Sequence, residues 1–255
     1  MRHVETLYLA WHSHREDTWY TVGRLDCDSD VYRFKYLAGS VIARREADFG
    51  GVAQFPDESK EYQSTNLFAF VENRVLSENR PEYEDHTRRL GLEPEDLRPF
   101  DRLSRSNGRR VTDTFELYPA PLESGDRISL HFFSRGVRYL DDALKELWKK
   151  SEPTSPLRLK RDRDNEHDPY AIEILDDEGR ELGYVPRYYT QSLAQILDAN
   201  CSYEVELVQH NKEPGYVRER FLLRLDAQTP EGWYFPQSDE YDAVSSVLEA
   251  EHDAA

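Results

Sequence analysis

The sequence lacks the features that mark several protein classes. It has only two cysteines, Cys27 and Cys201, which lie far apart and outside any Cys-x-x-Cys or Cys/His pattern. Neither a disulfide framework nor a zinc site is therefore predicted, and each cysteine is expected to be a buried free thiol. No run approaches the roughly 20 apolar residues of a membrane helix, and the N-terminus, MRHVETLYLAWHSHRED, has too short an apolar core for a secretion signal. These absences predict a cytoplasmic protein with no membrane partner.

Positive charge is also scarce. The chain has 33 Lys and Arg residues against 50 Asp and Glu residues, a net charge of −17, which argues against general adhesion to nucleic acid. However, 26 of the basic residues are Arg, whose planar guanidinium can grip phosphate with two hydrogen bonds, so local anion sites remain compatible with the acidic chain. The last 30 residues carry eight acidic residues and no basic one. We expect residues 229–255 to form an acidic tail, whose end, Glu240–Ala255, is either a short helix or disordered.

The composition that remains is that of a folded protein. Hydrophobic residues make up 38% and aromatic residues 12% of the 255 residues, which is too rich in aromatics for a disordered chain and enough for one large or two small domains. Pro119, Pro121 and Gly125 interrupt the pattern and predict a boundary near residue 122. The expected domains are therefore residues 1–122 and 123–228.

Residues 1–122 show both strand and helix patterns. Strands rich in aromatic and β-branched residues are predicted at 4–11, 19–25, 31–37 and 114–118. The apolar period changes at Asn66, from which residues 67–76 fit one helical face. Two further helices are predicted at 81–91 and 95–106, the first beginning at Pro81 and ending near Gly91. We therefore expect a small α+β domain.

Residues 123–228 are expected to form a small β-barrel with two helices. The helices are predicted at 141–150 and 188–199. Short strands alternate with them, at 127–133, 157–161, 171–175, 180–185, 203–210 and 216–225. The predicted fold class is accordingly α+β, with two small domains of which the second is the barrel.

No catalytic pattern stands out. The stretch FPDESK, Phe55–Lys60, has the residue types of a metal-dependent nuclease, but its carboxylates lie too close in sequence to converge from separate elements, which favours a solvated turn. The sequence has no nucleophile elbow, phosphate-binding glycine loop or zinc-protease motif. We predict neither an enzyme nor a cofactor or metal.

The stretch RDRDNEHDPYAI, residues 161–172, has a polar tip made by Asn165, His167 and Asp168. The amide can donate and accept, the carboxylate can accept from a hydroxyl, and the imidazole offers a flat ring for a base. Nearby cations are balanced by acidic residues, which suits recognition of a polar end group better than tracking of a phosphate backbone. The alternative is a hairpin whose Asp and Asn side chains cap their own turn.

Three motifs around this loop, GVRYLDD (136–142), LRLKRDRDNEHDPYAIEIL (157–175) and GRELGYVPRYYTQSLAQIL (179–197), resemble the HIRAN domain. The resemblance covers about residues 128–225. It implies a modified OB-like barrel with two helices that, in fork-remodelling helicases, grips the free 3′ hydroxyl end of single-stranded DNA. Two positions depart from those helicases, which have Tyr where this chain has Leu140 and His167.

The resemblance implies a role for each matching residue. Arg138 is expected to contact a phosphate, and Tyr139 to stack on a base, while His167 stands at a stacking position. Asn165 and Asp168 are expected to hydrogen-bond the terminal nucleotide. Tyr184 and Arg187 would flank the last phosphate.

The first domain more loosely resembles the N-terminal subdomain of HipA-type toxin kinases. The similarity lies in TVGRL (21–25), YRFKY (32–36), the stretch 67–92 and PFDRLSRSNGRRVTD (99–113). That subdomain is not catalytic, and no kinase core follows it in this chain. This domain also contains a basic run, made by Arg98, Arg102, Arg105, Arg109 and Arg110. The run either contacts nucleic acid or an acidic partner, or is a solvated face.

These observations lead to two function hypotheses. The first is a non-catalytic nucleic-acid-binding protein that recognises single-stranded DNA or its 3′ ends, in DNA repair or phage defence. The second is a protein-interaction regulator, such as an antitoxin-like partner of a HipA-type kinase, that binds its partner through residues 1–122.

Overall fold

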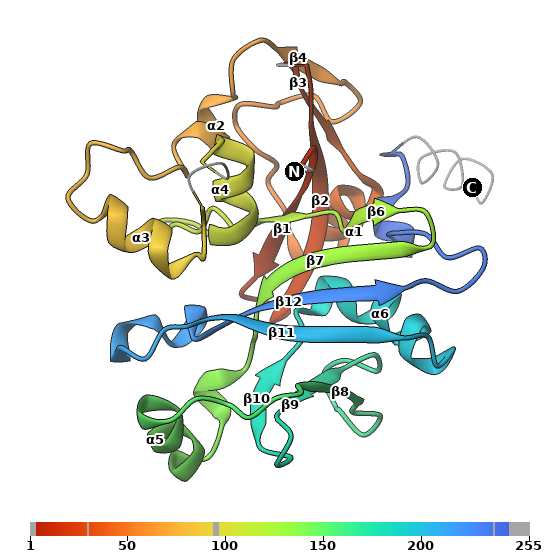
Figure 1. The fold of residues 1–255 in the computed structure, drawn as a ribbon. Helices are drawn as coiled ribbons and strands as arrows, with labels where there is room; N and C mark the ends of the chain where they lie inside the picture. Colours follow the sequence, from red (N-terminus) through yellow and green to blue (C-terminus); the bar gives the residue numbers. More distant parts are fainter. Residues whose placement is uncertain (1–3, 30, 94–96, 237, 245–255) are drawn as a thin grey trace. The chain divides into compact units, whose positions relative to one another are not determined.

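The chain folds into two compact units, each of which is discontinuous in sequence (Figure 1). The computed structural model describes residues 4–29, 31–93, 97–236 and 238–244. Unit 1 is formed by described residues of Met1–Tyr83, Pro94–Ala120 and Pro236–Ala255. Unit 2 is formed by Glu84–Glu93 and Pro121–Phe235. Residues 84–93 and the described residues of 236–255 therefore belong to a unit other than that of their sequence neighbours. The three continuous domains expected from the sequence stay a prediction.

Unit 1 is built on one antiparallel sheet with strand order β4-β3-β2-β1-β5. Its strands are β1 (Thr6–Ser13), β2 (Thr18–Asp28), β3 (Val31–Tyr36), β4 (Tyr62–Ser64) and β5 (Phe115–Pro119). The pairing of β1 with β2 shifts between Leu9 and Ala10. Such a bulge changes the face to which the following side chains point, and Leu9 and Ala10 are both buried as neighbours in the strand.

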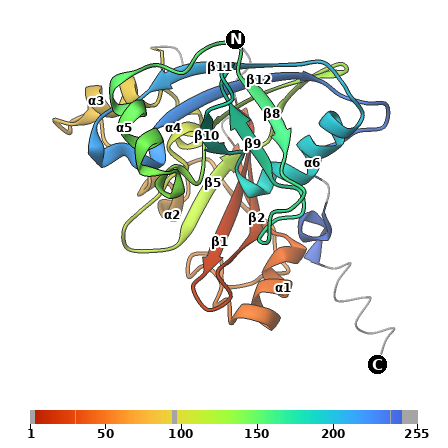
Figure 2. The same ribbon diagram turned by 90° about the horizontal axis from the view of Figure 1, so that it is seen from below.

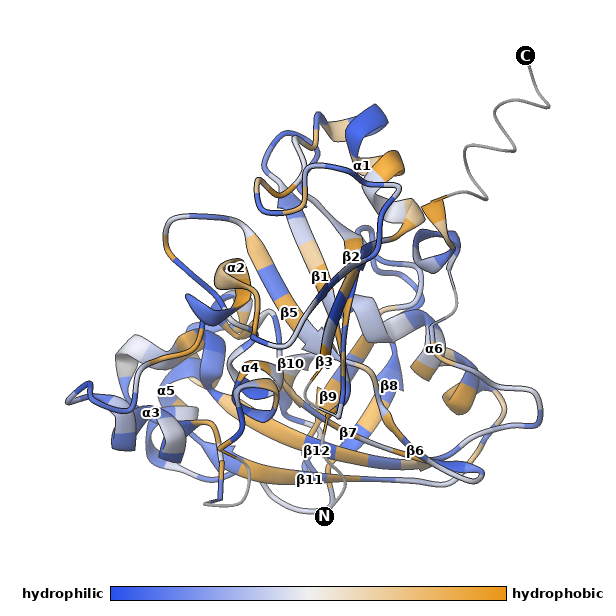
Figure 3. Ribbon diagram, turned by 90° about the horizontal axis from the view of Figure 1, so that it is seen from above, coloured by the Kyte–Doolittle hydropathy of each residue, from blue (hydrophilic) through white to orange (hydrophobic). Residues whose placement is uncertain are grey.

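A helix that the sequence patterns did not predict, α1 (Ala38–Ala47), follows β3 directly. Its buried residues are small, and Figure 3 shows both hydrophilic and hydrophobic residues along it. A Cβ atom at Gly39 would lie 2.1 Å from the carbonyl oxygen of Thr21 in β2. Only glycine therefore allows this close approach of helix and strand.

The other helices of the N-terminal region are shorter than predicted. The expected helix from Asn66 is reduced to α2 (Ala69–Glu72), and α4 spans Pro99–Ser106. A third helix, α3 (Tyr83–Arg89), starts at the end of a unit 1 segment and continues into unit 2. Proline at the first position of α4 fits its fixed backbone angle.

Unit 2 contains two antiparallel sheets. One has the order β11-β12-β7-β6, and the other β10-β9-β8. The strands are β6 (Leu122–Ser124), β7 (Arg127–Phe133), β8 (Arg158–Arg161), β9 (Ile172–Leu175), β10 (Glu181–Tyr184), β11 (Tyr203–His210) and β12 (Phe221–Gln228). Figure 3 shows hydrophobic residues along β7 and β12, the two central strands of the larger sheet. In the part of the chain that the structure describes, neither sheet closes into a barrel, so the mixed α and β class is confirmed but the predicted OB-like barrel is not.

Besides most of α3, the described part of unit 2 contains two α-helices and two 3-10 helices. They are α5 (Asp142–Lys150), α6 (Arg187–Asp198), η2 (Val137–Tyr139) and η3 (Pro214–Glu219). The Asp141 carboxylate caps α5 by accepting from the Leu144 N–H at 2.7 Å. The strand predicted from Tyr216 begins only at Phe221, because η3 occupies the preceding residues.

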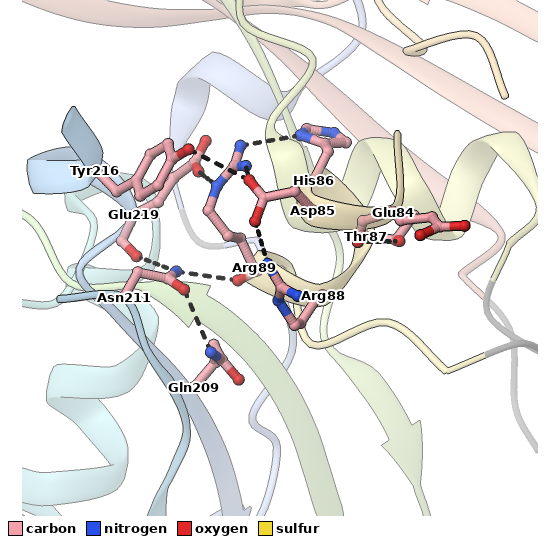
Figure 4. Close-up of polar contacts among 10 residues, drawn as sticks. All are labelled: Glu84, Asp85, His86, Thr87, Arg88, Arg89, Gln209, Asn211, Tyr216 and Glu219. Carbon is pink, nitrogen blue, oxygen red and sulfur yellow. Dashed lines mark hydrogen bonds and ion pairs between the residues drawn. The ribbon is translucent and has the colours of Figure 1, made fainter. Parts of the chain in front are cut away.

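Residues 84–93 supply unit 2 with part of its core and with polar contacts, of which Figure 4 shows the polar contacts. Leu90 is fully buried against Phe133 of β7 and Leu222 of β12. The backbone carbonyl of Arg89 accepts from the Asn211 side-chain amide at 3.1 Å, and that same amide donates to the Glu219 carbonyl at 2.6 Å. The sequence pattern assigned this stretch to the first domain, because nothing in it signals which sheet its one buried leucine will join.

Three further expectations concern the tail, the cysteines and the membrane. Described tail residues form the 3-10 helix η4 (Asp239–Tyr241) and pack on unit 1, whereas residues 245–255 of the predicted helix or disordered end lie outside the described residues. Cys27 and Cys201 are partly exposed rather than buried. Among the described residues, no helix combines the length and apolar character required to span a bilayer.

Candidate nucleic-acid interface

The site is anchored by one backbone pair between the segment after β7 and the end of β10. The N–H of Arg135 donates to the Tyr184 carbonyl at 2.8 Å, and the N–H of Tyr184 donates to the Arg135 carbonyl at 2.8 Å. Gly183 has a φ of 101°, and a Cβ atom there would lie 2.2 Å from the Arg135 carbonyl oxygen. Glycine is therefore required where the segment leading to η2 crosses β10.

The short helix η2 presents an aromatic ring and a cation together. Gly136 before it has a φ of 76°, and a Cβ atom there would lie 3.4 Å from the Tyr184 ring. Tyr139 is 75% exposed, and the Arg138 guanidinium carbon lies 4.7 Å from the centre of its ring. Leu140 is buried instead, so it packs in the core rather than offering a surface contact. An exposed ring beside an arginine is a suitable platform for an unpaired base and its phosphate.

Tyr184 also connects to the charged loop through Asp162. Its hydroxyl donates to Asp162 Oδ2 at 3.1 Å, and the Asn165 amide donates to the same oxygen at 3.0 Å. The hydrogen bond from Asn165 holds the pKa of Asp162 below its ordinary value, with Tyr184 adding to the effect. Burial, followed by the Asp162 carboxylate, raises the pKa of Tyr184. Asp162 therefore stays ionised near neutral pH, and Tyr184 keeps its proton.

The two polar residues at the loop tip cap the turn. Asn165 Oδ1 accepts from the N–H groups of His167 at 3.0 Å and Asp168 at 3.1 Å. Asp168 Oδ1 accepts from the Tyr170 N–H at 2.8 Å, and its Oδ2 accepts from Thr190 Oγ1 at 2.8 Å. These are turn-capping bonds of the kind that the alternative interpretation predicts. The side chains thus fix the loop, and their contacts with a nucleotide stay a prediction.

Thr190 brings the loop to the first turn of α6. It lies three residues after Arg187, the first residue of α6, which is exposed. Pro186, the N-cap residue, makes no side-chain capping bond. The first turn of a helix has N–H groups without helical partners and a partial positive charge, which together favour a nearby anion. Figure 2 shows α6 beside β8 and β9 of the smaller sheet.

The charges divide into paired and unpaired cations. Each basic residue of β8 and the following loop has a carboxylate partner, in the pairs Arg158–Asp177, Lys160–Glu173 at 2.8 Å, Arg161–Asp198 at 2.5 Å and Arg163–Asp198 at 2.9 Å. Arg138 and Arg187 are exposed, and among the described residues no carboxylate lies within ion-pair distance of either. The cations left to attract a phosphate are therefore the two outside the charged loop.

The structure brings most of the predicted site residues into one chain of contacts. It runs from η2 through Tyr184 and Asp162 to the loop tip, and from Asp168 through Thr190 to the start of α6. His167 is exposed at the tip. Sequence reasoning missed Thr190 as a contact of the loop, since no local pattern links it to a residue 22 positions earlier.

Two other sequence candidates are used locally. Hydrogen bonds from Ser59 and Lys60 lower the pKa of Asp57 to about 2, and its pair with Lys60 at 2.9 Å fits a solvated turn. Most of the basic run of the first domain is paired internally, in Arg98–Asp101, Arg102–Glu78 and Arg109–Glu116. That run consequently has little free charge for a nucleic acid.

Comparison with protein families gives a match within the second unit. Residues 128–226 match the model of the HIRAN domain. This part of the chain is similar to a HIRAN domain. HIRAN implies nucleic-acid binding, and HIRAN domains are generally binding domains rather than catalysts. The HipA-like character of the first domain stays a prediction, as does the antitoxin-like role derived from it.

Two solved structures are similar to the chain. A protein from Lactobacillus plantarum is 21% identical, with a TM-score of 0.32, and the match covers 41% of this chain and 93% of that one. The HIRAN domain of human HLTF is 20% identical, with a TM-score of 0.32, and the match covers 50% of this chain and 94% of that one. No curated protein matches the chain.

Proposed function

We propose that the HIRAN domain of this protein binds single-stranded DNA and prefers a free 3′ hydroxyl end. The observation that carries the proposal is the exposed ring of Tyr139 with the Arg138 guanidinium 4.7 Å from its centre, on a helix held against Tyr184. A base stacks on Tyr139, and Arg138 contacts the adjacent phosphate. Arg187 and the open first turn of α6 receive the next phosphate.

Single-stranded nucleic acid fits this site better than a duplex. Stacking on a side chain needs a base that is not already stacked in a helix, and each such contact contributes about 1–3 kcal/mol. Among the described residues, Arg138 and Arg187 are the two unpaired cations that flank the site, and the protein carries a net charge of −17. Binding of an extended duplex backbone would require more neutralised phosphates than these two provide.

The preference for a 3′ end rests on Asp168. Its two carboxylate oxygens accept from Tyr170 and Thr190, and each oxygen has lone-pair capacity for a second donor. A terminal hydroxyl is such a donor, whereas a terminal phosphate brings negative charge to a carboxylate. The capped turn holds Asp168 in place for this contact.

Replacing the stacking residue tests the proposal. Tyr139→Ala should weaken binding of fluorescein-labelled single-stranded DNA about tenfold or more, because one base stack is lost. The measurement is fluorescence anisotropy at fixed salt. Tyr234→Ala is the matched control, since Tyr234 is also in the second unit and 64% exposed. Equal binding by the wild type and Tyr139→Ala, with both folded, would contradict the proposal.

The end preference has a separate test. Strands ending in a 3′ hydroxyl should bind several-fold more tightly than the same strands ending in a 3′ phosphate, and Asp168→Asn should reduce this ratio toward one. A melting curve of the variant checks that the loop still folds without one accepting oxygen. Equal affinity for both strands in the wild type would remove the 3′-end preference and leave stacking on Tyr139 as the basis of binding.

A further inference from the structure

Seven residues near the described end of the chain, Ser238–Val244, occupy a site on unit 1. Unit 1 otherwise uses no residue after Ala120, and the chain forms nearly all of unit 2 before it returns. Glu240 Oε2 accepts from the Thr21 N–H at 2.8 Å, and the Tyr241 hydroxyl lies 2.6 Å from that of Tyr118. The segment is thus held through specific side-chain contacts rather than by apolar packing alone.

The pocket for Tyr241 is lined by residues that already contact one another. The rings of Tyr8 and Tyr118 are stacked with centres 5.5 Å apart, and Thr21 Oγ1 lies 2.8 Å from the Tyr118 hydroxyl. Tyr241 adds its ring edge to Tyr8, with centres 5.0 Å apart. Tyr118 is fully buried and Thr21 nearly so. The pocket is therefore built by residues from other parts of unit 1, and Tyr241 of the segment fills it.

The backbone of the segment pairs with unit 1 where β3 passes into α1. The Ala38 N–H donates to the Asp242 carbonyl at 2.9 Å, and Leu37 forms an isolated antiparallel bridge with Ala243. No strand of the five-stranded sheet comes from the segment. Val244 follows as a buried apolar anchor that joins the core of unit 1. A backbone bridge, an aromatic pocket and an apolar anchor are features of a bound peptide.

We propose that unit 1 is a peptide-binding module, that residues 238–244 are its ligand bound within the same chain, and that the site also accepts this segment from a second copy of the protein. The recognised motif is Glu-Tyr-Asp-Ala-Val, in which Glu240, Tyr241 and Val244 make the contacts. A second copy carries the same motif, so exchange of the segment joins two copies without any new contact type. This inference is independent of nucleic-acid binding.

The test begins with the full chain carrying a protease site between Phe235 and Pro236, so that the segment can leave after cleavage. A labelled peptide of residues 236–246 should then bind the cleaved protein saturably, as measured by fluorescence anisotropy. The uncleaved chain should bind the same peptide at least about tenfold more weakly, because its own segment competes at high effective concentration.

Variant peptides separate the named contacts from general acidity. Tyr241→Ala should weaken binding about tenfold or more, because the residue in the central pocket is lost. Glu240→Gln should weaken it about threefold to tenfold, because the hydrogen bond to the Thr21 N–H loses its charged acceptor. Asp239→Asn is the matched control, since it removes the same charge from an exposed side chain and should change affinity less than about twofold.

Oligomeric state tests the part played by a second copy. The uncleaved chain should form a concentration-dependent dimer by light scattering, and excess peptide should dissociate it. Loss of native structure on release of the segment would show that the segment is an integral part of the core, and would overturn the proposal. A folded cleaved protein that never binds the peptide would also overturn it. Peptide binding without any dimer would overturn the second-copy claim and assign the site to another acidic, tyrosine-containing partner.

Discussion

At the scale of single residues, much of the stability around the site rests on glycines and one carboxylate. Gly183 permits the crossing of β10 by the segment that carries Arg135, and the carboxylate of Asp176 is fully buried. Asp176 accepts from the Thr154 N–H at 3.2 Å and from Arg180 Nε at 2.8 Å. Neither residue is expected to contact a nucleotide, yet both fix the sheet from which Tyr184 extends.

Substitution of Gly183 and Gly179 should separate the cost of a positive φ from the cost of a steric clash at Cβ. Gly183→Ala forces a positive φ on alanine and places Cβ 2.2 Å from the Arg135 carbonyl oxygen. Gly179→Ala carries only the first cost, since its φ is 78° and nothing lies within 4 Å of its Cβ position. We expect Gly179→Ala to lose about 1–2 kcal/mol of unfolding free energy and Gly183→Ala clearly more. Urea denaturation measures both, and equal losses would contradict the close approach.

Asp176 should make stability depend on pH in the acid range. Burial alone would raise the pKa of Asp176, but hydrogen bonds from Arg180 and Thr154 outweigh it and hold the pKa below the ordinary value. Since the folded pKa is the lower one, the stabilisation is complete above the ordinary carboxyl pKa of about 4 and is lost as the pH falls through the folded value. The gap in unfolding free energy between the wild type and Asp176→Asn should therefore shrink between neutral pH and about pH 3.

Removal of the same carboxylate gives a larger effect at neutral pH. Asp176→Ala leaves the N–H groups of Thr154 and Arg180 without their acceptor and leaves the Arg180 guanidinium with Glu178 as its carboxylate partner, so we expect a loss of about 3–5 kcal/mol. Asp177→Ala is the matched control, because it removes only the exposed pair with Arg158 and should cost less than about 1 kcal/mol. Similar melting curves for the two variants would show that Asp176 does not hold the turn.

At the scale of elements, segment 84–93 is where unit 2 depends on a distant part of the chain. The Arg89 guanidinium lies 4.0 Å from the centre of the Tyr216 ring and bonds Glu219 at 3.2 Å, both in η3 (Figure 4). The helix η3 in turn contacts η2, which carries Arg138 and Tyr139. Segment 84–93 therefore supports η3, and η3 contacts η2, the helix that carries the proposed stacking residue Tyr139.

Leu90 provides the test of this support. Leu90→Ala should destabilise unit 2 by about 2–5 kcal/mol, because a fully buried leucine is removed from contact with Phe133 and Leu222. Leu92 is only partly buried beside the same cluster, so Leu92→Ala should lower the unfolding free energy less than Leu90→Ala does. Tryptophan fluorescence during urea unfolding measures both. A Leu90→Ala variant as stable as the wild type would mean that the segment is not part of the core.

The sequence predicted elements with a strong local signal and missed those set by tertiary contact. Apolar and aromatic patterns located the longer strands of both units, as in β7 and β11, but not the three-residue strands β4 and β6. The helix α1 was missed because its buried face consists of small residues that carry no apolar period. The site loop was found from its motif, whereas Thr190 and the assignment of Leu90 to unit 2 depend on which segments meet in space.

At the scale of the whole molecule, the dominant property is the net charge of −17. Long-range repulsion of DNA by this charge would leave the proposed binding dependent on stacking on Tyr139 and on Arg138 and Arg187. If these two cations each neutralise one phosphate, the slope of log K against log salt should be about −1.4. Titrations at several salt concentrations measure it. A slope of about −4 or steeper would indicate a backbone-tracking surface and contradict the proposed site.

The return of residues 238–244 to unit 1 also sets an order of events during synthesis. The ribosome makes the pocket residues Tyr8, Thr21 and Tyr118 early, then all of unit 2, and only then the residues that fill the pocket. Throughout that interval the pocket of a nascent chain is open to any finished copy nearby. If the site accepts the segment of a second copy as proposed, a released copy can fill the pocket of a nascent chain before the chain's own segment has been made.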